Sequence, residues 1–277
     1  MKYTKIDRRT FLKAAGLTAV AASASGLLAG CGSASSSTSD YEYIQGKGKL
    51  VIGMTIFNPM NYYDENGKLI GFDTELAEAV CAKLNLTPEF QEIEWDNKIT
   101  ELSSKNIDCI WNGMTVTEDL GKSIDFSTPY SGNMQVCVIS KANAGTYTSI
   151  DSINAAGVTV GAEAGSAGES AVEENFPNAE LISMTSQRDC LLELKSGTID
   201  VGVMDFVMAD AELQDGTSYT DLQIVDGIEL SKEEYAVGLR KGSDFTEVLN
   251  KTLDELVADG TVAALAEKYP SVMVTLG

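Results

Sequence analysis

From Lys49 to the C-terminus, short apolar runs alternate with stretches in which apolar and polar residues are mixed at regular spacing. Short apolar runs, as in 107–114 and 199–204, are typical of buried strands. Between these runs, apolar residues recur at spacings of three and four, which predicts helices with one face on a core; the helix expected over 74–84 carries Leu76, Ala77, Val80, Cys81 and Leu84 in this way. Strands that alternate with helices predict an α/β fold with largely parallel strands.

The expected elements fall into two successive sets. The first set has strands over 49–55, 88–95, 107–114 and 135–140, and helices over 74–84 and 97–104. The second set has strands over 157–162, near Leu181 and over 199–204, and helices after Ser166 and over 189–195. A strand over 234–241, a helix from Phe245 that ends before Gly260, and a short helix to Tyr269 complete the chain. We therefore expect two α/β lobes.

Two local signals mark connections in the first set. Asn66-Gly67 predicts a hairpin turn within 61–72, because both residues accept positive φ. The neighbouring acidic residues lack the spacing of a calcium loop. Asp73 stands where an N-cap belongs, so we expect its side chain to cap the helix over 74–84.

Residues 1–30 differ in composition from the rest and are expected to be a signal peptide. A basic front precedes an uncharged run over 14–30 that is too short and too rich in Ala and Gly for a membrane span. Arg8-Arg9 and its neighbours resemble a twin-arginine export signal, and Leu28-Ala29-Gly30-Cys31 resembles a lipobox whose cysteine is lipidated. The alternative for Cys31 is an ordinary small residue at a cleavage site. Residues 31–47 are expected to be a lipid-anchored flexible linker.

The charge narrows the class of partner. The formal net charge is −21, and it becomes about −25 once residues 1–30, with five basic residues and one acid, are removed. Such a charge argues against nucleic acid or anionic lipid as a partner of the folded body. It mildly favours cationic ligands, although most of the acids are expected simply to solvate the surface.

The chain has no histidine. Ser-His-Asp and Cys-His catalysis and histidine-rich metal sites are therefore excluded, and we expect no metal or cofactor. Catalysis by carboxylates alone stays open. The four cysteines after Cys31 lie in apolar runs without metal-site or Cys-x-x-Cys spacing, so we expect buried free thiols rather than disulfides at Cys81, Cys109, Cys137 and Cys190.

A series of short motifs follows in a fixed order: Lys49-Leu50-Val51-Ile52-Gly53, Gly71-Phe72-Asp73, Glu94-Trp95-Asp96, Ile107-Asp108, Gly113-Met114-Thr115-Val116-Thr117, Ile124-Asp125-Phe126-Ser127, Ser196-Gly197-Thr198-Ile199-Asp200, Glu234-Tyr235 and Lys241-Gly242-Ser243. Their order and spacing resemble those of the polar amino-acid-binding proteins of ABC importers, extracellular solute-binding protein family 3, in the lipoprotein form. The resemblance covers nearly all of residues 48–270.

The resemblance implies two α/β lobes joined by two hinge crossovers, a periplasmic-binding-protein-like architecture of type II. Lobe 1 is expected over 48–132 and 236–277 and lobe 2 over 133–235, with crossovers near 133–138 and 230–236. A monomer of this kind closes on a small amino acid or amine and delivers it to the permease of an ABC importer. The resemblance further implies that the protein acts outside the cytoplasm, anchored to the outer face of the cell membrane through Cys31, and that it is no enzyme.

The resemblance also implies ligand contacts at Phe57, Trp95, Asn112, Gly113, Met114, Thr115, Glu163, Gly165, Ser166 and Asp205. The aromatic faces suit an aliphatic stem or a cation, and the helix after Ser166 suits a carboxylate. Asp205 matches the carboxylate that pairs with the ligand's ammonium. The alternatives are core packing for the aromatic residues and helix capping for Asp205.

One position departs from the family pattern. Leu120 stands where the family has the arginine that binds the ligand's carboxylate, and leucine offers no donor. Either Lys122 or backbone groups hold a carboxylate, or the ligand is an amine without one. Two other classes stay open: a ligand-sensing receptor domain that acts through a partner, and a dehydratase-like enzyme that uses Glu163 and Asp205.

Overall fold

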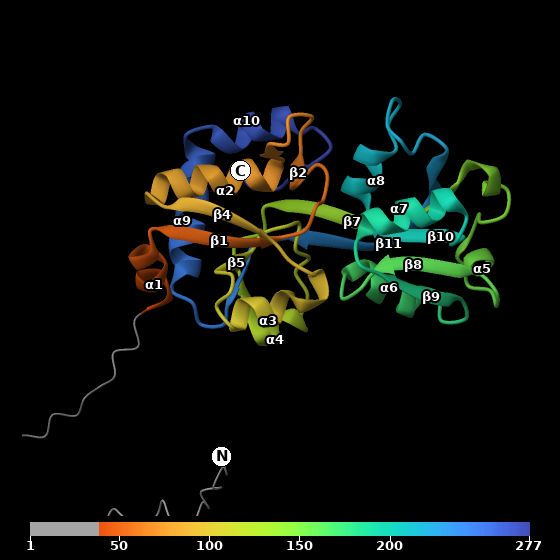
Figure 1. Ribbon diagram of the computed structural model, residues 1–277, viewed down its shortest axis with the longest axis horizontal. Coiled ribbons are helices and arrows are strands. Elements are labelled where there is room, and N and C mark those ends of the chain that lie inside the picture. The colour runs from red at the N-terminus through yellow and green to blue at the C-terminus, as the bar shows by residue number, and fades with distance from the viewer. Residues whose placement is uncertain (1–38) are drawn as a thin grey trace, which may run out of the picture. The chain divides into compact units, whose positions relative to one another are not determined.

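The computed structural model describes residues 39–277, and the predicted signal peptide and Cys31 lie outside this range. The described chain forms two lobes, each built around one sheet (Figure 1). In lobe 1 the first pass of the chain forms α1 (Asp40–Lys47), β1 (Lys49–Met54), β2 (Tyr62–Tyr63), β3 (Leu69–Ile70), α2 (Phe72–Leu84), β4 (Thr87–Glu92), α3 (Lys98–Ser103), β5 (Cys109–Ile110), α4 (Leu120–Ser123) and β6 (Ile124–Phe126).

Lobe 2 follows in one stretch, after which the chain returns to lobe 1. Lobe 2 consists of β7 (Ser131–Ser140), α5 (Ile150–Ile153), β8 (Thr159–Glu163), α6 (Ala167–Asn175), β9 (Glu180–Met184), α7 (Gln187–Ser196), β10 (Val201–Asp205), α8 (Phe206–Glu212) and β11 (Leu222–Tyr235). The returning segment forms β12 (Gly238–Arg240), α9 (Phe245–Ala258), α10 (Thr261–Lys268) and β13 (Met273–Val274), of which β13 pairs with β7.

Both sheets are parallel at one side and antiparallel at the other. The order in lobe 1 is β4-β1-β5-β12-β6, where β1 is parallel to β4 and β5 while β12 runs antiparallel. The order in lobe 2 is β11-β7-β10-β8-β9, where β8 is parallel to β9 and β10 while β7 runs antiparallel to β10 and β11. The predicted α/β class with two lobes is confirmed, and the sheets are mixed.

Strand β1 shows why the buried strands read as continuous apolar runs. Successive side chains of a strand point to opposite faces of the sheet. Leu50 and Ile52 belong to the core shared with α2 and α9, whereas Val51 belongs to the core that contains Leu102 of α3. Because helices cover both faces of the sheet (Figure 1), both sets of side chains are apolar.

Strands β7 and β11 connect the two lobes. They pair antiparallel over most of their length, with register shifts between Ile224 and Glu229 and again before Ser231. The predicted crossovers over 133–138 and 230–236 fall on these two strands, apart from Ala236, which follows β11. The fourteen-residue β11 was not predicted, since only its last two residues lie in the strand expected over 234–241.

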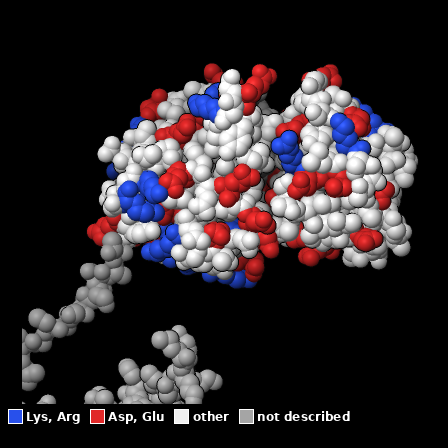
Figure 2. Space-filling view, viewed as in Figure 1, with Lys and Arg blue, Asp and Glu red and all other residues white. Residues whose placement is uncertain are grey.

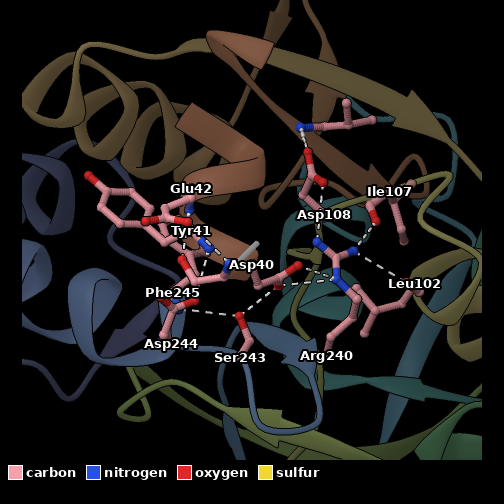
Figure 3. A network of polar contacts seen from close by, with 12 residues as sticks. Asp40, Tyr41, Glu42, Leu102, Ile107, Asp108, Arg240, Ser243, Asp244 and Phe245 are labelled. Carbon is pink, nitrogen blue, oxygen red and sulfur yellow. Dashed lines mark hydrogen bonds and ion pairs between the residues drawn. The ribbon is translucent and has the colours of Figure 1, made fainter. Parts of the chain in front are cut away.

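Helix α1 corrects the predicted linker over 31–47, because residues 40–47 are helical and docked on lobe 1. Ser39 and Glu42 form a capping box, and Ile44 is fully buried. Asp40 accepts hydrogen bonds from Arg240 Nε at 2.9 Å and from Ser243 Oγ at 2.7 Å (Figure 3). The Arg240 guanidinium also donates to the carbonyl of Ile107 at 2.7 Å.

The hairpin at Asn66-Gly67 is confirmed: β2 pairs with β3, and Gly67 has a φ of +76°. Cys81, Cys109, Cys137 and Cys190 are buried free thiols, as expected. No helix within residues 39–277 has the length and apolar character to cross a membrane. Acidic side chains are spread over the visible face of both lobes (Figure 2).

Candidate functional site

A cavity of about 240 Å³ lies between the lobes, at the ends of strands from both sheets. All ten residues predicted to contact a ligand line it, and Leu120 does so as well. The sequence did not identify seven further lining residues, which are Thr55, Lys98, Thr117, Asp119, Ala167, Ser170 and Gln187. The structure thus brings the predicted residues together, and their contact with a ligand stays a prediction.

Two aromatic side chains of lobe 1 form part of the wall. Phe57 follows β1 and exchanges two backbone hydrogen bonds of 2.7 Å with Asn61. Its ring packs edge-to-face with the ring of Tyr235, with the two ring centroids 6.5 Å apart. Trp95 begins the turn before α3. Both side chains are buried in hydrophobic clusters and also line the cavity. Each of them therefore packs in the core and forms part of the cavity wall.

The turn after β5 is fixed by side chains from other segments. Asn112 Oδ1 accepts from the Thr55 N–H at 3.0 Å, and Asn112 Nδ2 donates to the Thr55 carbonyl at 2.9 Å. Gly113 has a φ of +56°, and a Cβ there would lie 2.5 Å from the Phe57 ring. This turn therefore needs glycine. Met114 is buried, and Thr115 Oγ1 donates to Glu233 Oε2 at 3.0 Å.

Asp73 supports this turn, and its predicted role as the N-cap of α2 is wrong. The helix begins at Phe72, with Gly71 at the N-cap position and no side-chain cap. The Asp73 carboxylate instead accepts from the Gly113 N–H at 2.7 Å and from Tyr130 Oη at 2.8 Å. Complete burial raises the pKa of Asp73 to about 7.

In lobe 2, Glu163 ends β8 and the turn to α6 follows at Gly165 and Ser166. Ser166 is the N-cap, and its Oγ accepts from the Glu169 N–H at 3.1 Å. Glu169 Oε2 accepts from the Gly165 N–H at 2.7 Å. Donors expected to receive a ligand carboxylate at this helix start are therefore partly satisfied within the chain.

Asp205 ends β10 and is surrounded by hydrogen-bond donors. Its Oδ1 accepts from Gln135 Nε2 at 2.8 Å, from Tyr235 Oη at 2.7 Å and from Asn133 Nδ2, while its Oδ2 accepts from Gln187 Nε2. Asp205 occupies the N-cap position of α8, but its side chain makes no capping bond. Burial, followed by the charge of Glu233, raises the pKa of Asp205 to about 7.

Lys98 is the one cationic side chain from residues 39–277 that lines the cavity. Its Nζ donates to the carbonyls of Trp95 at 3.2 Å and of Gly165 at 2.8 Å, and lies 4.8 Å from the centre of the Trp95 ring. Burial lowers the pKa of Lys98, against the opposing charge of Glu163. Its position three residues after Trp95 was the only signal in the sequence.

Lys122, the side chain expected to replace the missing arginine, lies outside the cavity. Its Nζ pairs with Asp119 at 3.0 Å, and its side chain is 68% exposed. Within residues 39–277, no three His, Cys, Asp or Glu side chains are grouped so that they could hold a metal ion. The site is thus a polar cavity with buried carboxylates, one ammonium and aromatic walls.

Comparison with known proteins identifies the family. The model of the bacterial extracellular solute-binding proteins, family 3, matches residues 50–271. The chain belongs to this family. The family's members act outside the cytoplasm, and the chain's homologues are amino-acid-binding proteins of ABC transporters.

Two curated relatives and one solved structure show the extent of the likeness. The L-cystine-binding protein TcyJ of Escherichia coli is 30% identical over 84% of this chain and 86% of its own length. The arginine-binding extracellular protein ArtP of Bacillus subtilis is 30% identical over 91% of this chain and 96% of its own. The P235GK mutant of ArgBP from T. maritima is 32% identical, with a TM-score of 0.77 over 84% of this chain and 99% of that structure. The type II architecture is therefore confirmed.

Proposed function

We propose that this family member captures a small polar amino acid or related amine between its lobes and delivers it to the permease of an ABC importer. The observation that carries the proposal is the cavity itself, which joins the aromatic side chains of lobe 1 to the buried carboxylates of lobe 2. Its homologues bind amino acids, which supports the same class of ligand.

The size and chemistry of the cavity support a small cationic group. Ligand pockets commonly measure about 300–1,000 Å³, so a cavity of about 240 Å³ suits a molecule of amino-acid size. Burial disfavours the ionised forms of Glu163 and Asp205, and an ammonium group would stabilise them. Trp95 and Phe57 supply apolar faces for the rest of the ligand.

Hydrogen bonds between the lobes support closure around the ligand. Asn58 Nδ2 of lobe 1 donates to Glu212 Oε1 of lobe 2 at 2.9 Å, and Lys98 bonds the Gly165 carbonyl. Such contacts exist only when the lobes meet. A ligand that touches both lobes would favour this arrangement.

We propose further that the protein is a monomeric lipoprotein held at the outer face of the membrane through Cys31. The lipobox-like sequence Leu28-Ala29-Gly30-Cys31 supports the anchor. Mass spectrometry of the protein extracted from its own membrane tests it. A diacylglycerol-modified Cys31 at the mature N-terminus is expected, and an unmodified N-terminus at another residue would contradict the anchor.

The ligand is tested by thermal unfolding of residues 32–277 in the presence of each common amino acid, L-ornithine, L-cystine and simple amines. A ligand at a hundred times its Kd stabilises the folded state by about 2.7 kcal/mol, which is a measurable rise in Tm. Ala167→Trp, which fills the cavity from the start of α6, should remove the rise while keeping the ligand-free Tm. No rise with any compound would contradict the proposed function.

A further inference from the structure

A cationic and an acidic side chain line the cavity, and each has hydrogen-bonding capacity that the protein leaves unused. The first is the ammonium of Lys98, which is only 5% exposed. An ammonium has three N–H donors, and two of them bond the carbonyls of Trp95 and Gly165. Lys98 forms no ion pair with any carboxylate among residues 39–277. One donor and the whole charge therefore remain for another partner.

The second group is the carboxylate of Glu163, which is 4% exposed. Its Oε1 is buried and has no hydrogen-bond partner among the described residues. A buried acceptor without a partner has lost its hydrogen bonds to water and gained none in return, which destabilises the protein. The side chain lies at the cavity wall, so a ligand donor can satisfy it.

Asp205 differs from Glu163 in this respect. A carboxylate has about four lone-pair positions, and four donors already occupy the Asp205 oxygens: Asn133, Gln135, Gln187 and Tyr235. Three of these donors share Oδ1, so a ligand ammonium at Asp205 would be limited to the position beside Gln187 on Oδ2. At Glu163 it would meet an acceptor that is free.

We propose that Lys98 binds the carboxylate of a zwitterionic ligand and Glu163 binds its ammonium, so that this pair replaces the missing guanidinium at Leu120. The inference rests on the proposed function and narrows the ligand to an amino acid, since a simple amine leaves Lys98 unpaired. Leu120 then contributes only an apolar surface to the cavity.

The pair suits a zwitterion because Lys98 and Glu163 form no ion pair with each other, and a ligand ammonium would stabilise the ionised form of Glu163. The Lys98 ammonium is held against Trp95 and the Gly165 carbonyl, outside ion-pair distance of Glu163. Buried charges of opposite sign attract a complementary dipole more strongly than the same charges in water, because the effective dielectric constant is lower. Lys98 belongs to lobe 1 and Glu163 to lobe 2, so the ligand would bridge the lobes.

Titration calorimetry with two probes tests the inference. The probes are the amino acid that most raises the Tm of the wild type and the α-carboxamide of the same amino acid, which keeps the ammonium and loses the negative charge. The wild type should bind the carboxamide at least about 10-fold more weakly. Lys98→Met should weaken the amino acid about 10- to 100-fold and bind both probes alike. Glu163→Gln should weaken both probes.

Two further variants control for folding and for general charge effects. Lys98→Arg retains a cation and should retain the preference for the amino acid, so a loss in Lys98→Met alone reports the charge. Lys122→Met removes an exposed lysine outside the cavity and should bind both probes as the wild type does.

The outcomes separate the inference from the proposed function. Equal binding of both probes by the wild type, or an unchanged preference in Lys98→Met, would overturn the inference and leave a solute-binding protein. Binding of simple amines but of no amino acid would do the same. If no amino acid or amine binds the wild type, the proposed function fails and the inference fails with it.

Discussion

Glu163 and Asp205 line the cleft and Asp73 supports the turn at Gly113, and these three buried carboxyl groups differ in their partners. Both oxygens of Asp205 and Oδ2 of Asp73 receive hydrogen bonds from neighbouring residues, whereas Asp73 Oδ1 and Glu163 Oε1 receive none within the described chain. Burial raises the pKa of Glu163 to about 8, with a smaller contribution from the charge of Asp205. The same side chain that is offered to a ligand thus makes the empty protein sensitive to pH.

The sign of this sensitivity follows from proton binding. Glu163 binds its proton more tightly in the folded protein, where its pKa is about 8, than in the unfolded chain, where a glutamate titrates near pH ~4.3. The folded state therefore holds more protons between these values, and the free energy of unfolding is highest at the acidic end and falls as pH rises toward 8.

Urea unfolding of the ligand-free protein from pH 5 to pH 8 tests this expectation. Glu163→Gln should make the fall in unfolding free energy shallower, because the amide does not titrate. Asp119→Asn removes an acidic group whose side chain is 92% exposed and should leave the slope nearly unchanged. Equal slopes in the wild type and in Glu163→Gln would contradict the assigned burial of Glu163.

At the scale of elements, helix α1 shows that amino-acid composition alone does not predict where a linker ends and a helix begins. The linker predicted over 31–47 rests on the Ser-rich composition of residues 32–39, yet Ile44 is fully buried and Asp40 pairs with Arg240, a residue two hundred positions later in the chain. Long-range contacts of this kind leave no local pattern, so only the folded structure reveals them.

Replacing Ile44 measures how firmly α1 is docked. Ile44→Ala should lower the free energy of unfolding by about 2–4 kcal/mol, since it leaves a cavity in the core. Gln45→Ala, on the exposed side of the same helix, should change it by less than about 0.5 kcal/mol. Urea unfolding gives both values, and a negligible effect at Ile44 would favour the flexible linker instead.

Elements with a repeating pattern were predictable, and those defined by single contacts were not. Strands such as β1 and β10 are buried on both faces and α2 has a helical spacing of apolar residues, so their positions follow from the sequence. β11 was missed because its buried residues Leu222, Val225, Ile228 and Tyr235 lack the two-residue spacing of a strand, and because it is interrupted near Gly227, which has a φ of +78°. Lys98 was missed because a lysine on a helix is usually solvated.

At the scale of the whole molecule, the proposed closure predicts that hydrogen bonds between the lobes favour the closed form. Asn58 and Glu212 are hydrogen-bonded across the lobes, and neither lines the central cavity. Removing this bond should destabilise the closed form without touching the ligand. Apparent affinity falls in proportion to the population of the form that binds.

Asn58→Ala should therefore weaken ligand binding about 3- to 10-fold by calorimetry, as expected for one hydrogen bond. Small-angle X-ray scattering should show a smaller compaction at subsaturating ligand. Glu212→Ala should have a similar effect, and the double variant should lose little more than either single one. Additive losses would show that the two side chains act separately.

The docking of α1 on lobe 1 also bears on how the two lobes would move relative to each other. Arg240, Ser243 and Asp244 hold the start of α1 against lobe 1 (Figure 3). The described chain therefore begins on lobe 1, and β7 and β11 carry it to lobe 2 and back. With the anchor proposed at Cys31, lobe 1 would be the lobe next to the membrane attachment along the chain, and the proposed closure would move lobe 2 relative to it.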